Sequence, residues 1–290
     1  LIGRTPSPKI LMKAFAEVKP TVILSVPLIL EKIYKKMIQP QISKKPVSWV
    51  LKMPLLDKVV LNKIRETPMN AFGGEFSQII IGGAPLNAEV EAFLRRIKFP
   101  VTVGYGMTET APLISFTPWT EFRSQSCGQV LKGFMNARIA NPDADGVGEI
   151  QVRGENVMAG YYKNEQATAE SFTEDGWLRT GDLGIIDEDG FIYIKGRCKT
   201  MLLGPSGQNI YPEEIEAKIN NMPYVLESLV LQKDTKLVAL VCPDFEAVDA
   251  DHLTQDQLEV VMEENRKLVN AELATYEQIN EVRVYTHEFE

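Results

Sequence analysis

Histidine and cysteine are both scarce in this 290-residue sequence, which has two histidines and three cysteines. The histidines, His252 and His287, both lie near the carboxyl terminus. This excludes most Ser-His-Asp and Cys-His catalytic arrangements and most His-rich zinc sites. The cysteines are odd in number and far apart, which indicates a reducing cytoplasm rather than a disulfide framework. Any catalysis must therefore rest on backbone amides, carboxylates, lysine and arginine.

Long hydrophobic runs are also missing. The longest, residues 21–30, is broken by Pro27 and is far shorter than the ~20 residues that a membrane-spanning helix needs. No signal peptide is visible, and Leu1 is not an initiator methionine, so we expect a cytoplasmic protein whose sequence is cut short at its start. Residues 32–65 are rich in lysine and read as a solvated connection, with a weak peripheral contact to anionic lipid at the inner membrane surface as an alternative.

The charge of the chain is negative and uneven. The net charge of -8 argues against nucleic acid as a partner. Residues 200–290 contain 6 Lys and Arg against 18 Asp and Glu, so the rest of the chain carries a net positive charge. The change of sign near residue 200 indicates two domains.

Strand and helix patterns alternate in the first part of the chain. Because buried strands separated by helices are typical of parallel sheets covered on their faces, the alternation predicts an α/β fold. After about residue 128 the pattern becomes β-rich, with a hairpin over residues 184–194 that turns at Asp189-Gly190. Beyond residue 196 we expect a small α+β unit. The predicted strands are 21–26, 78–81, 101–103, 148–152, 229–231, 237–241 and 282–285, and the predicted helices are 8–18, 27–37, one capped by Asn87, one opened by residues 211–214, and 255–275.

Two glycine-containing segments directly follow predicted strands. In open α/β sheets, ligands bind beyond the carboxyl ends of the strands. The small residues of the first segment, residues 82–86, would let a flat ring lie against the backbone, although a plain strand-to-helix turn explains the segment better when it is taken alone. The second segment combines an aromatic ring at Tyr105, a hydroxyl donor at Thr108 and a carboxylate at Glu109, a hard oxygen ligand suited to Mg²⁺. These three groups form a minimal nucleotide site.

Two further segments carry charged side chains beside glycines. Asp182 follows Gly181 just before the predicted hairpin and could accept both hydroxyls of a ribose, although an aspartate in a loop is common. Arg197 follows Gly196 and could neutralise phosphate charge. The glycines at residues 204 and 207 read as a mobile loop, and a basic hairpin end joined to a surface loop is the plain alternative.

In this order, the segments resemble the adenylate-forming superfamily of acyl-CoA synthetases, adenylation domains and firefly luciferase. Residues 105–109 match its YGxTE signature, residues 148–161 (GEIQVRGENVMAGY) match its glycine-rich element, and residues 179–183 match RTGDL. Residues 196–216 match its hinge and the glycine loop that follows. Three segments have amino-acid sequences most similar to those of bacterial long-chain fatty-acid–CoA ligases: residues 82–97, 103–112 and 202–216. The resemblance covers nearly the whole chain.

The resemblance implies a division into a partial large AMP-binding domain, residues 1–196, and a small mobile domain, residues 197–290, that is incomplete at its end. A β-rich subdomain would occupy about residues 128–196. The large domain would be mixed α/β and the small one α+β.

The resemblance also implies roles for particular residues. Thr108 would bind the α-phosphate, Glu109 would hold Mg²⁺, and Asp182 would bind the ribose hydroxyls. Lys199 matches the family hinge, and Thr200 departs from the acidic or amide residue that is usual beside it. The remaining assignments are Gly83, Ala84 and Pro85 along the adenine, Tyr105 stacked on the adenine, Gly106 in the nucleotide site, Arg197 on ribose or phosphate, and Gly204, Ser206 and Gly207 in the loop for thioester formation.

The activity implied is that of an ATP-dependent acid–CoA ligase, in which a fatty acid, ATP and coenzyme A are the substrates. The family's Ser/Thr/Gly-rich phosphate loop and its carboxyl-terminal lysine are absent, so we expect the chain alone to be inactive. A ligase for another acid, an adenylation domain that loads a carrier protein, and a non-catalytic nucleotide-binding module are the alternatives.

Overall fold

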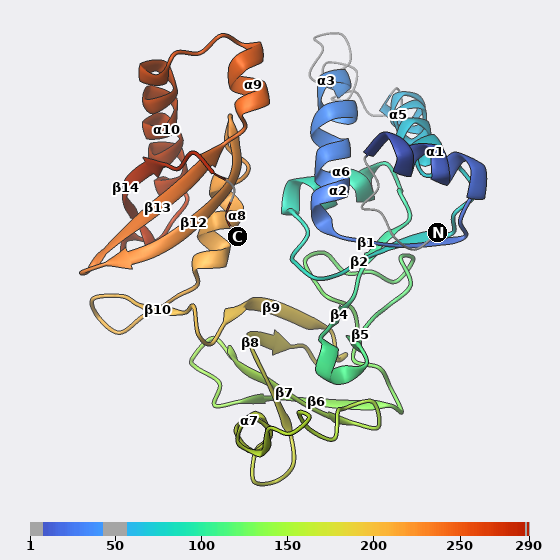
Figure 1. The fold of residues 1–290 in the computed structure, drawn as a ribbon, viewed down its shortest axis with the longest axis vertical. Helices are drawn as coiled ribbons and strands as arrows, with labels where there is room; N and C mark the ends of the chain where they lie inside the picture. The colour runs from blue at the N-terminus through green and yellow to red at the C-terminus, as the bar shows by residue number, and fades with distance from the viewer. Residues whose placement is uncertain (1–7, 43–56, 288, 290) are drawn as a thin grey trace. The chain divides into compact units, whose positions relative to one another are not determined.

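The computed structural model describes residues 8–42, 57–287 and 289. The chain divides into two compact units. Figure 1 labels the helices and strands. The first contains Leu1–Arg138, Gln151–Arg179 and Ile186–Tyr193, and the second contains Ile139–Ile150, Thr180–Ile185 and Ile194–Glu290.

A three-stranded parallel sheet forms the centre of the first unit, as the alternating pattern predicts. Its strands are β1 (Val22–Ser25), β2 (Gln78–Ile81) and β3 (Val101–Val103), in the order β1-β2-β3. Ile79 and Ile81 are fully buried in its core, together with side chains from the helices. These helices are α1 (Pro8–Val18), α2 (Pro27–Ile33), α5 (Asp57–Ala71) and α6 (Ala88–Arg96). Asn87 caps α6 as predicted, because its side chain accepts hydrogen bonds from the amides of residues 89 and 90.

The expectation of a solvated connection over residues 32–65 is wrong where the structure describes these residues. The chain stays helical from α2 through a π-helix, Tyr34–Ile38, to α3 (Gln39–Ile42), and α5 begins at Asp57. Apolar side chains such as Ile38 and Leu61 are buried in the core, whereas Lys32 and Lys35 of the helical segment are exposed. Residues 43–56 lie outside the described part. Among the described helices, none is long and apolar enough to cross a membrane.

The first strand also differs from its prediction as a buried segment. In β1, Ile23 is buried but Leu24 is 77% exposed. Successive side chains of a strand point to opposite faces, and the helix-packed core takes the face that carries Ile23. An apolar run in the sequence does not show whether one face or both faces of a strand are packed against other parts of the chain.

The β-rich part that follows contains a predicted hairpin and several elements that the sequence did not predict. A four-stranded sheet has the order β6 (Met135–Ala140), β7 (Gly148–Gly154), β8 (Leu178–Ile186) and β9 (Ile192–Arg197). The turn between β8 and β9 is at the predicted place, and Gly190 there has a φ of 86°. Strand β6 and the short helix α7 (Glu165–Ser171) were not predicted.

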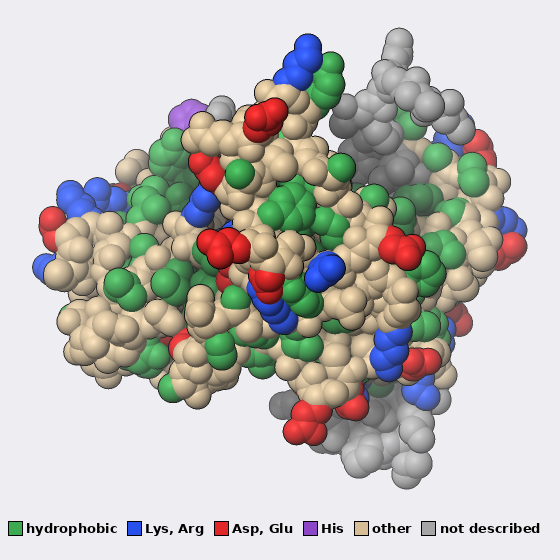
Figure 2. All heavy atoms as spheres, turned by 90° about the horizontal axis from the view of Figure 1, so that it is seen from below, with side chains coloured by type: hydrophobic (Ala, Val, Ile, Leu, Met, Phe, Trp, Pro, Cys, Tyr) green, Lys and Arg blue, Asp and Glu red, His purple; other side chains and the backbone are tan. Residues whose placement is uncertain are grey.

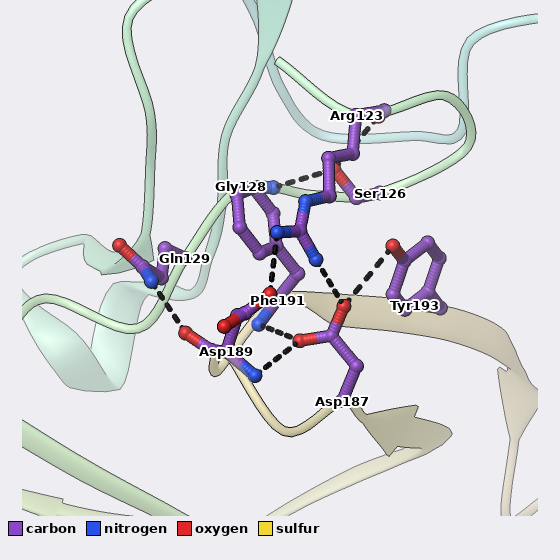
Figure 3. A network of polar contacts seen from close by, with 8 residues as sticks. All are labelled: Arg123, Ser126, Gly128, Gln129, Asp187, Asp189, Phe191 and Tyr193. Carbon is purple, nitrogen blue, oxygen red and sulfur yellow. Dashed lines mark hydrogen bonds and ion pairs between the residues drawn. The ribbon is translucent and has the colours of Figure 1, made fainter. Parts of the chain in front are cut away.

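Arg123 ties a long loop of the first unit to this turn (Figure 3). Its guanidinium forms ion pairs with Asp187, at 2.8 Å, and with Asp189, and lies 4.0 Å from the centroid of the Phe191 ring. The side chain of Gln129, in the same loop, donates to the backbone carbonyl of Asp189. We call this set of contacts the Arg123 clamp.

The second unit contains the small α+β region predicted from the sequence. Its sheet has the order β12 (Val225–Lys233), β13 (Lys236–Pro243) and β14 (Ile279–Val284). Strands β12 and β13 are antiparallel, and β13 and β14 are parallel. Helix α10 (Gln255–Asn270) ends earlier than predicted. The other elements are β10 (Leu202–Leu203), β11 (Asn209–Ile210), α8 (Pro212–Ile219) and the unpredicted α9 (Phe245–Ala250).

Charged side chains on the visible face of the described residues are mixed in sign. Figure 2 shows Lys and Arg interspersed with Asp and Glu on this face, rather than gathered into a basic patch.

Candidate nucleotide site

The two glycine segments begin side by side at the carboxyl edge of the parallel sheet. The amide of Gly82 donates to the carbonyl of Ser25 at 3.1 Å, and the amide of Gly104 donates to that of Ile81 at 2.8 Å. A Cβ added to Gly82 would lie 3.7 Å from the carbonyl oxygen of Gly104. The topology therefore brings together the segments that the sequence singled out separately. This is the edge at which open α/β sheets bind ligands.

The first segment leaves its backbone open. Gly83, Ala84 and Pro85 are all exposed, and a Cβ on Gly83 would meet no atom within 4 Å. Its φ of 88° lies in the left-handed region that glycine adopts readily. A flat ligand can thus approach this backbone closely.

The second segment is more tightly held. Tyr105 and Gly106 form strand β4, which pairs with β5 (Leu113–Ser115). A side chain at Gly106 is excluded because its Cβ would lie 1.8 Å from the carbonyl oxygen of Pro112. Tyr105 is only 7% exposed, so little of its ring surface is accessible for stacking on a base.

Thr108 and Glu109 follow in a single turn of 3₁₀ helix, Thr108–Thr110. Thr108 is exposed and Glu109 is half-buried. The Tyr161 hydroxyl donates to Glu109 Oε1 at 2.8 Å, and this hydrogen bond raises the pKa of the Tyr161 phenol. The backbone carbonyl of Glu109 accepts from the amide of Met158 at 2.8 Å. The turn that carries Thr108 and Glu109 is thus held by residues 156–161, which are distant from it in the sequence.

Mg²⁺ fits the chemistry of this turn. Glu109 offers a carboxylate, the ligand type that Mg²⁺ prefers, beside the Thr108 hydroxyl. The hydrogen bond from Tyr161 uses Oε1 of Glu109 and leaves the second oxygen for a cation. Mg²⁺ commonly takes one or two protein carboxylates and completes its shell with phosphate oxygens and water, so a single carboxylate suffices.

The remaining predicted site residues lie in the second unit. Asp182 lies within strand β8 rather than in a loop, and its carboxylate forms an ion pair with Arg197 Nε at 2.9 Å. The amide of Cys198 donates to the carbonyl of Gly181 at 2.8 Å, which holds the neighbouring backbones together. Two residues proposed from separate motifs are therefore direct partners.

Lys199 lies in the exposed turn after β9. Thr200 Oγ1, beside it, donates to Glu213 Oε1 at 2.6 Å, so this turn is tied to the start of α8. A Cβ on Gly196 would lie 2.8 Å from the other carboxylate oxygen of Glu213, so a larger residue there would displace the end of this side chain. Thr200, the departure from the family pattern, thus has a structural partner.

The predicted thioester loop is the turn of the β10–β11 hairpin. Gly204 is buried, whereas Ser206 and Gly207 are exposed at the tip, where Gly207 has a φ of 82°. The amide of Gly204 donates to the carbonyl of Gln208 at 2.8 Å and closes the turn.

Asn156 and Tyr161 are residues near the site to which sequence reasoning gave no role. Both lie in the glycine-rich motif over residues 148–161, and that match was the available signal. Sequence spacing could not show that this motif contacts Glu109.

Comparison with known proteins identifies a family, sequences and solved structures that this chain resembles. The sequence pattern of the family described as "AMP-binding enzyme" matches residues 2–162. Long-chain-fatty-acid–CoA ligase FadD15 of Mycobacterium bovis is 33% identical over 273 residues, 86% of this chain and 44% of that protein. Long-chain-fatty-acid–CoA ligase ACSBG2 of Gallus gallus is 32% identical over 253 residues, 80% of this chain and 33% of that protein. The chain thus spans less than half the length of these relatives.

Solved structures share the fold. ATP-bound MatB from Rhodopseudomonas palustris has a TM-score of 0.66 and 27% identity, covering 97% of this chain and 50% of its own. The adenylation domain of a carboxylate reductase from Mycobacterium chelonae has a TM-score of 0.76 at 23% identity, covering 96% of this chain and 43% of its own, and shows the fold alone. The match over residues 2–162, more than half of the sequence, establishes that this chain belongs to the family of AMP-binding enzymes.

Proposed function

We propose that the protein carrying this chain is an ATP-dependent acid–CoA ligase that activates a long-chain fatty acid as its acyl-adenylate. One observation carries the proposal: the two glycine segments begin side by side at the carboxyl edge of the parallel sheet, and the second leads directly to Thr108 and Glu109. That arrangement suits a nucleotide whose base lies on open backbone and whose phosphates reach a hydroxyl and a metal-holding carboxylate. The chemistry of the relatives named above supports the same class.

The proposed roles in ATP binding follow the family pattern residue by residue. The adenine would lie along residues 83–85, with Tyr105 and Gly106 beside it. Asp182 would accept hydrogen bonds from the ribose hydroxyls, and its partner Arg197 would contact ribose or phosphate. A carboxylate suits a diol because it is an acceptor only, with lone pairs for two donors.

In the first half-reaction, the fatty carboxylate attacks the α-phosphorus of ATP and pyrophosphate leaves. Thr108 would donate to an α-phosphate oxygen and stabilise the negative charge that builds there. Mg²⁺ held by Glu109 would neutralise phosphate charge.

In the second half-reaction, the thiol of coenzyme A attacks the acyl carbon and AMP leaves. The exposed hairpin tip with Ser206 and Gly207 would serve this step, after rotation of the small domain about Lys199. Such domain movements commonly separate the steps of an enzyme that binds several substrates in turn.

The decisive experiment is a screen of the full-length protein for pyrophosphate release with carboxylic acids of increasing chain length, followed by assay for the acyl-CoA product. We expect release that depends on a long-chain fatty acid, and an acyl-CoA only when coenzyme A is added. Release with a different class of acid would support another ligase of the family, and transfer only to a carrier protein would support a loading domain. Nucleotide binding without release for any acid would support the non-catalytic alternative.

Cytoplasmic location and weak peripheral contact with the inner membrane surface stay predictions from the sequence.

A further inference from the structure

The turn that carries Glu109 is held by contacts from three residues of one segment, residues 156–161. The Met158 amide donates to the backbone carbonyl of Glu109 at 2.8 Å. The side-chain amide of Asn156 donates to the carbonyls of Thr110, at 2.6 Å, and Leu113, at 2.9 Å. These contacts fix the backbone of the turn and the start of β5 after it, but not the direction of the Glu109 carboxylate.

The contact from the third residue acts on the carboxylate itself. The Tyr161 hydroxyl donates to Glu109 Oε1 at 2.8 Å, across 52 residues of sequence. A hydrogen bond to a charged acceptor is among the stronger ones, so it can select one rotamer of a half-buried glutamate. It also occupies one carboxylate oxygen and directs the other away from Tyr161.

The backbone of Tyr161 is in turn held by contacts with helix α7. Its backbone amide donates to Thr168 Oγ1 at 2.9 Å, and the Thr168 hydroxyl donates to the carbonyl of Asn164 at 2.8 Å. Asn164 caps helix α7, which carries Thr168. A Cβ on Gly160 would lie 2.7 Å from Thr168 Cγ2, so the glycine permits this close approach. The helix, the threonine and the tyrosine form a continuous support that ends at Glu109.

We propose that Tyr161 is a positioning residue that holds the Glu109 carboxylate in the orientation that binds Mg²⁺. The inference rests on the proposed function, because Glu109 is assigned there as the metal-holding residue. Partners that orient metal ligands typically change metal affinity by 10- to 100-fold when they are removed. Tyr161 would contact neither the metal nor ATP and would act through Glu109.

The test is the affinity of the full-length protein for Mn²⁺, measured by electron paramagnetic resonance in the presence of α,β-methylene-ATP, which cannot be split at the α-phosphorus. Mn²⁺ is a suitable probe because it favours the same oxygen ligands as Mg²⁺. We expect Tyr161→Phe to weaken Mn²⁺ binding about tenfold. The matched control is Tyr162→Phe, which removes the same atom from the next residue, whose side chain is 87% exposed. The control should bind Mn²⁺ like the unaltered protein.

A double variant tests whether Tyr161 acts through Glu109. Glu109→Gln should weaken Mn²⁺ binding by itself, and adding Tyr161→Phe should cause no further loss, because coupled residues are not additive. Thermal unfolding of each variant shows whether it is folded. Equal Mn²⁺ affinity for Tyr161→Phe and the unaltered protein would overturn the proposal, as would an additive loss in the double variant.

The outcomes separate this inference from the proposed function. If Glu109→Gln weakens Mn²⁺ binding but Tyr161→Phe does not, the inference fails and the metal assignment stands. If Glu109→Gln leaves Mn²⁺ affinity unchanged, the metal assignment fails, and the inference that rests on it fails as well. If both variants weaken Mn²⁺ binding but no acid releases pyrophosphate, the positioning role stands and the ligase activity does not.

Discussion

Glu216, in helix α8 of the second unit, is a half-buried carboxylate with one strong partner. Its Oε1 accepts the amide of Val230 at 2.7 Å. Burial raises the pKa of Glu216 to about 7 against the lowering effect of this hydrogen bond, and the nearby charge of Glu213 raises it further. The side chain is therefore partly protonated near neutral pH, unlike an ordinary glutamate.

This shift predicts a pH-dependent stability for the second unit. A carboxyl whose pKa is raised by folding stabilises the fold fully below the unfolded value of 4.5 and loses that contribution as the pH rises through about 7. We expect Glu216→Gln to keep the acceptor for Val230, to raise the free energy of unfolding at about pH 8, and to change it little at about pH 5. Urea unfolding at the two pH values measures both effects.

The matched control for that experiment is Glu264→Gln, at an exposed position of helix α10 in the same unit. It should alter the unfolding free energy similarly at both pH values. A loss of stability in Glu216→Gln that is the same at both pH values would contradict the burial argument, because a neutral glutamine would then be no better tolerated than the carboxylate.

At the residue scale, the sequence located the candidate site better than it described the contacts within it. Gly83, Tyr105 and Glu109 were found because strand ends and glycine segments are local signals. The contact between Tyr161 and Glu109 joins residues 52 apart, and no local pattern encodes it. The ion pair of Asp182 with Arg197 was missed for the same reason, although each residue was singled out.

At the scale of elements, the Arg123 clamp joins a loop to the turn between β8 and β9 (Figure 3). The clamp lies beside backbone hydrogen bonds that join the same two segments. The amide of Val130 donates to the carbonyl of Gly190 at 2.9 Å, and the amide of Cys127 donates to that of Ile192 at 2.8 Å. The side-chain and backbone contacts therefore support one another.

Arg123→Ala should loosen this junction without unfolding the first unit. Its effect should be local, because exposed ion pairs contribute little to global stability but restrict the segments they join. We expect faster hydrogen–deuterium exchange at the amides of Cys127 and Val130, and little change in the strands of the parallel sheet. Arg123→Lys should give an intermediate rate, since lysine keeps the charge but lacks the planar fork that contacts two carboxylates.

Arg153→Ala serves as the control for the clamp, because Arg153 is an exposed arginine of the same unit, in strand β7. It should leave exchange at Cys127 and Val130 unchanged. If Arg123→Ala also leaves those amides protected as before, the backbone hydrogen bonds hold the junction alone and the clamp has no such role.

Helices and strands with a regular spacing of apolar residues, a capping residue or a turn sequence were predictable from the sequence. Elements whose sequence also contains features typical of loops were not. Asn87 and the apolar face behind it gave α6, and the Asp189-Gly190 turn gave the β8–β9 hairpin. Helix α5 was missed because residues 32–65 are rich in lysine and contain prolines at 40, 46 and 54, although Leu61 and Ile64 are buried. The helix also contains Pro68. Packing against a core can compensate for a proline within a helix, and a local pattern does not show that core.

At the scale of the whole molecule, the change in charge near residue 200 lies close to a boundary between the two units. The last and longest segment of the second unit begins at Ile194. That unit also takes residues 139–150 and 180–185, which come from the part of the sequence expected to belong to the large domain. Charge along the chain cannot reveal such contributions, because contacts rather than sequence order define a compact unit.

The hinge proposed at Lys199 can be tested by restricting the backbone torsions of this residue. Lys199 lies in the turn after β9, and its φ is not positive. Proline fixes φ near about -65° and removes the amide donor, so Lys199→Pro should restrict the turn. A hinge works because a few backbone torsions change widely, and a restricted hinge should favour one orientation of the small domain.

Under the proposed function, the two half-reactions need different orientations of the small domain, so Lys199→Pro in the full-length protein should impair one far more than the other. Pyrophosphate release reports the first half-reaction, and acyl-CoA formation from pre-made acyl-adenylate reports the second. Lys199→Ala is the control, because it removes the side chain but leaves the backbone free, and it should preserve both steps. Equal losses in the two assays with Lys199→Pro would instead indicate a loss of stability. In that case Lys199 would be an ordinary surface residue, and the domain would turn about another position or not at all.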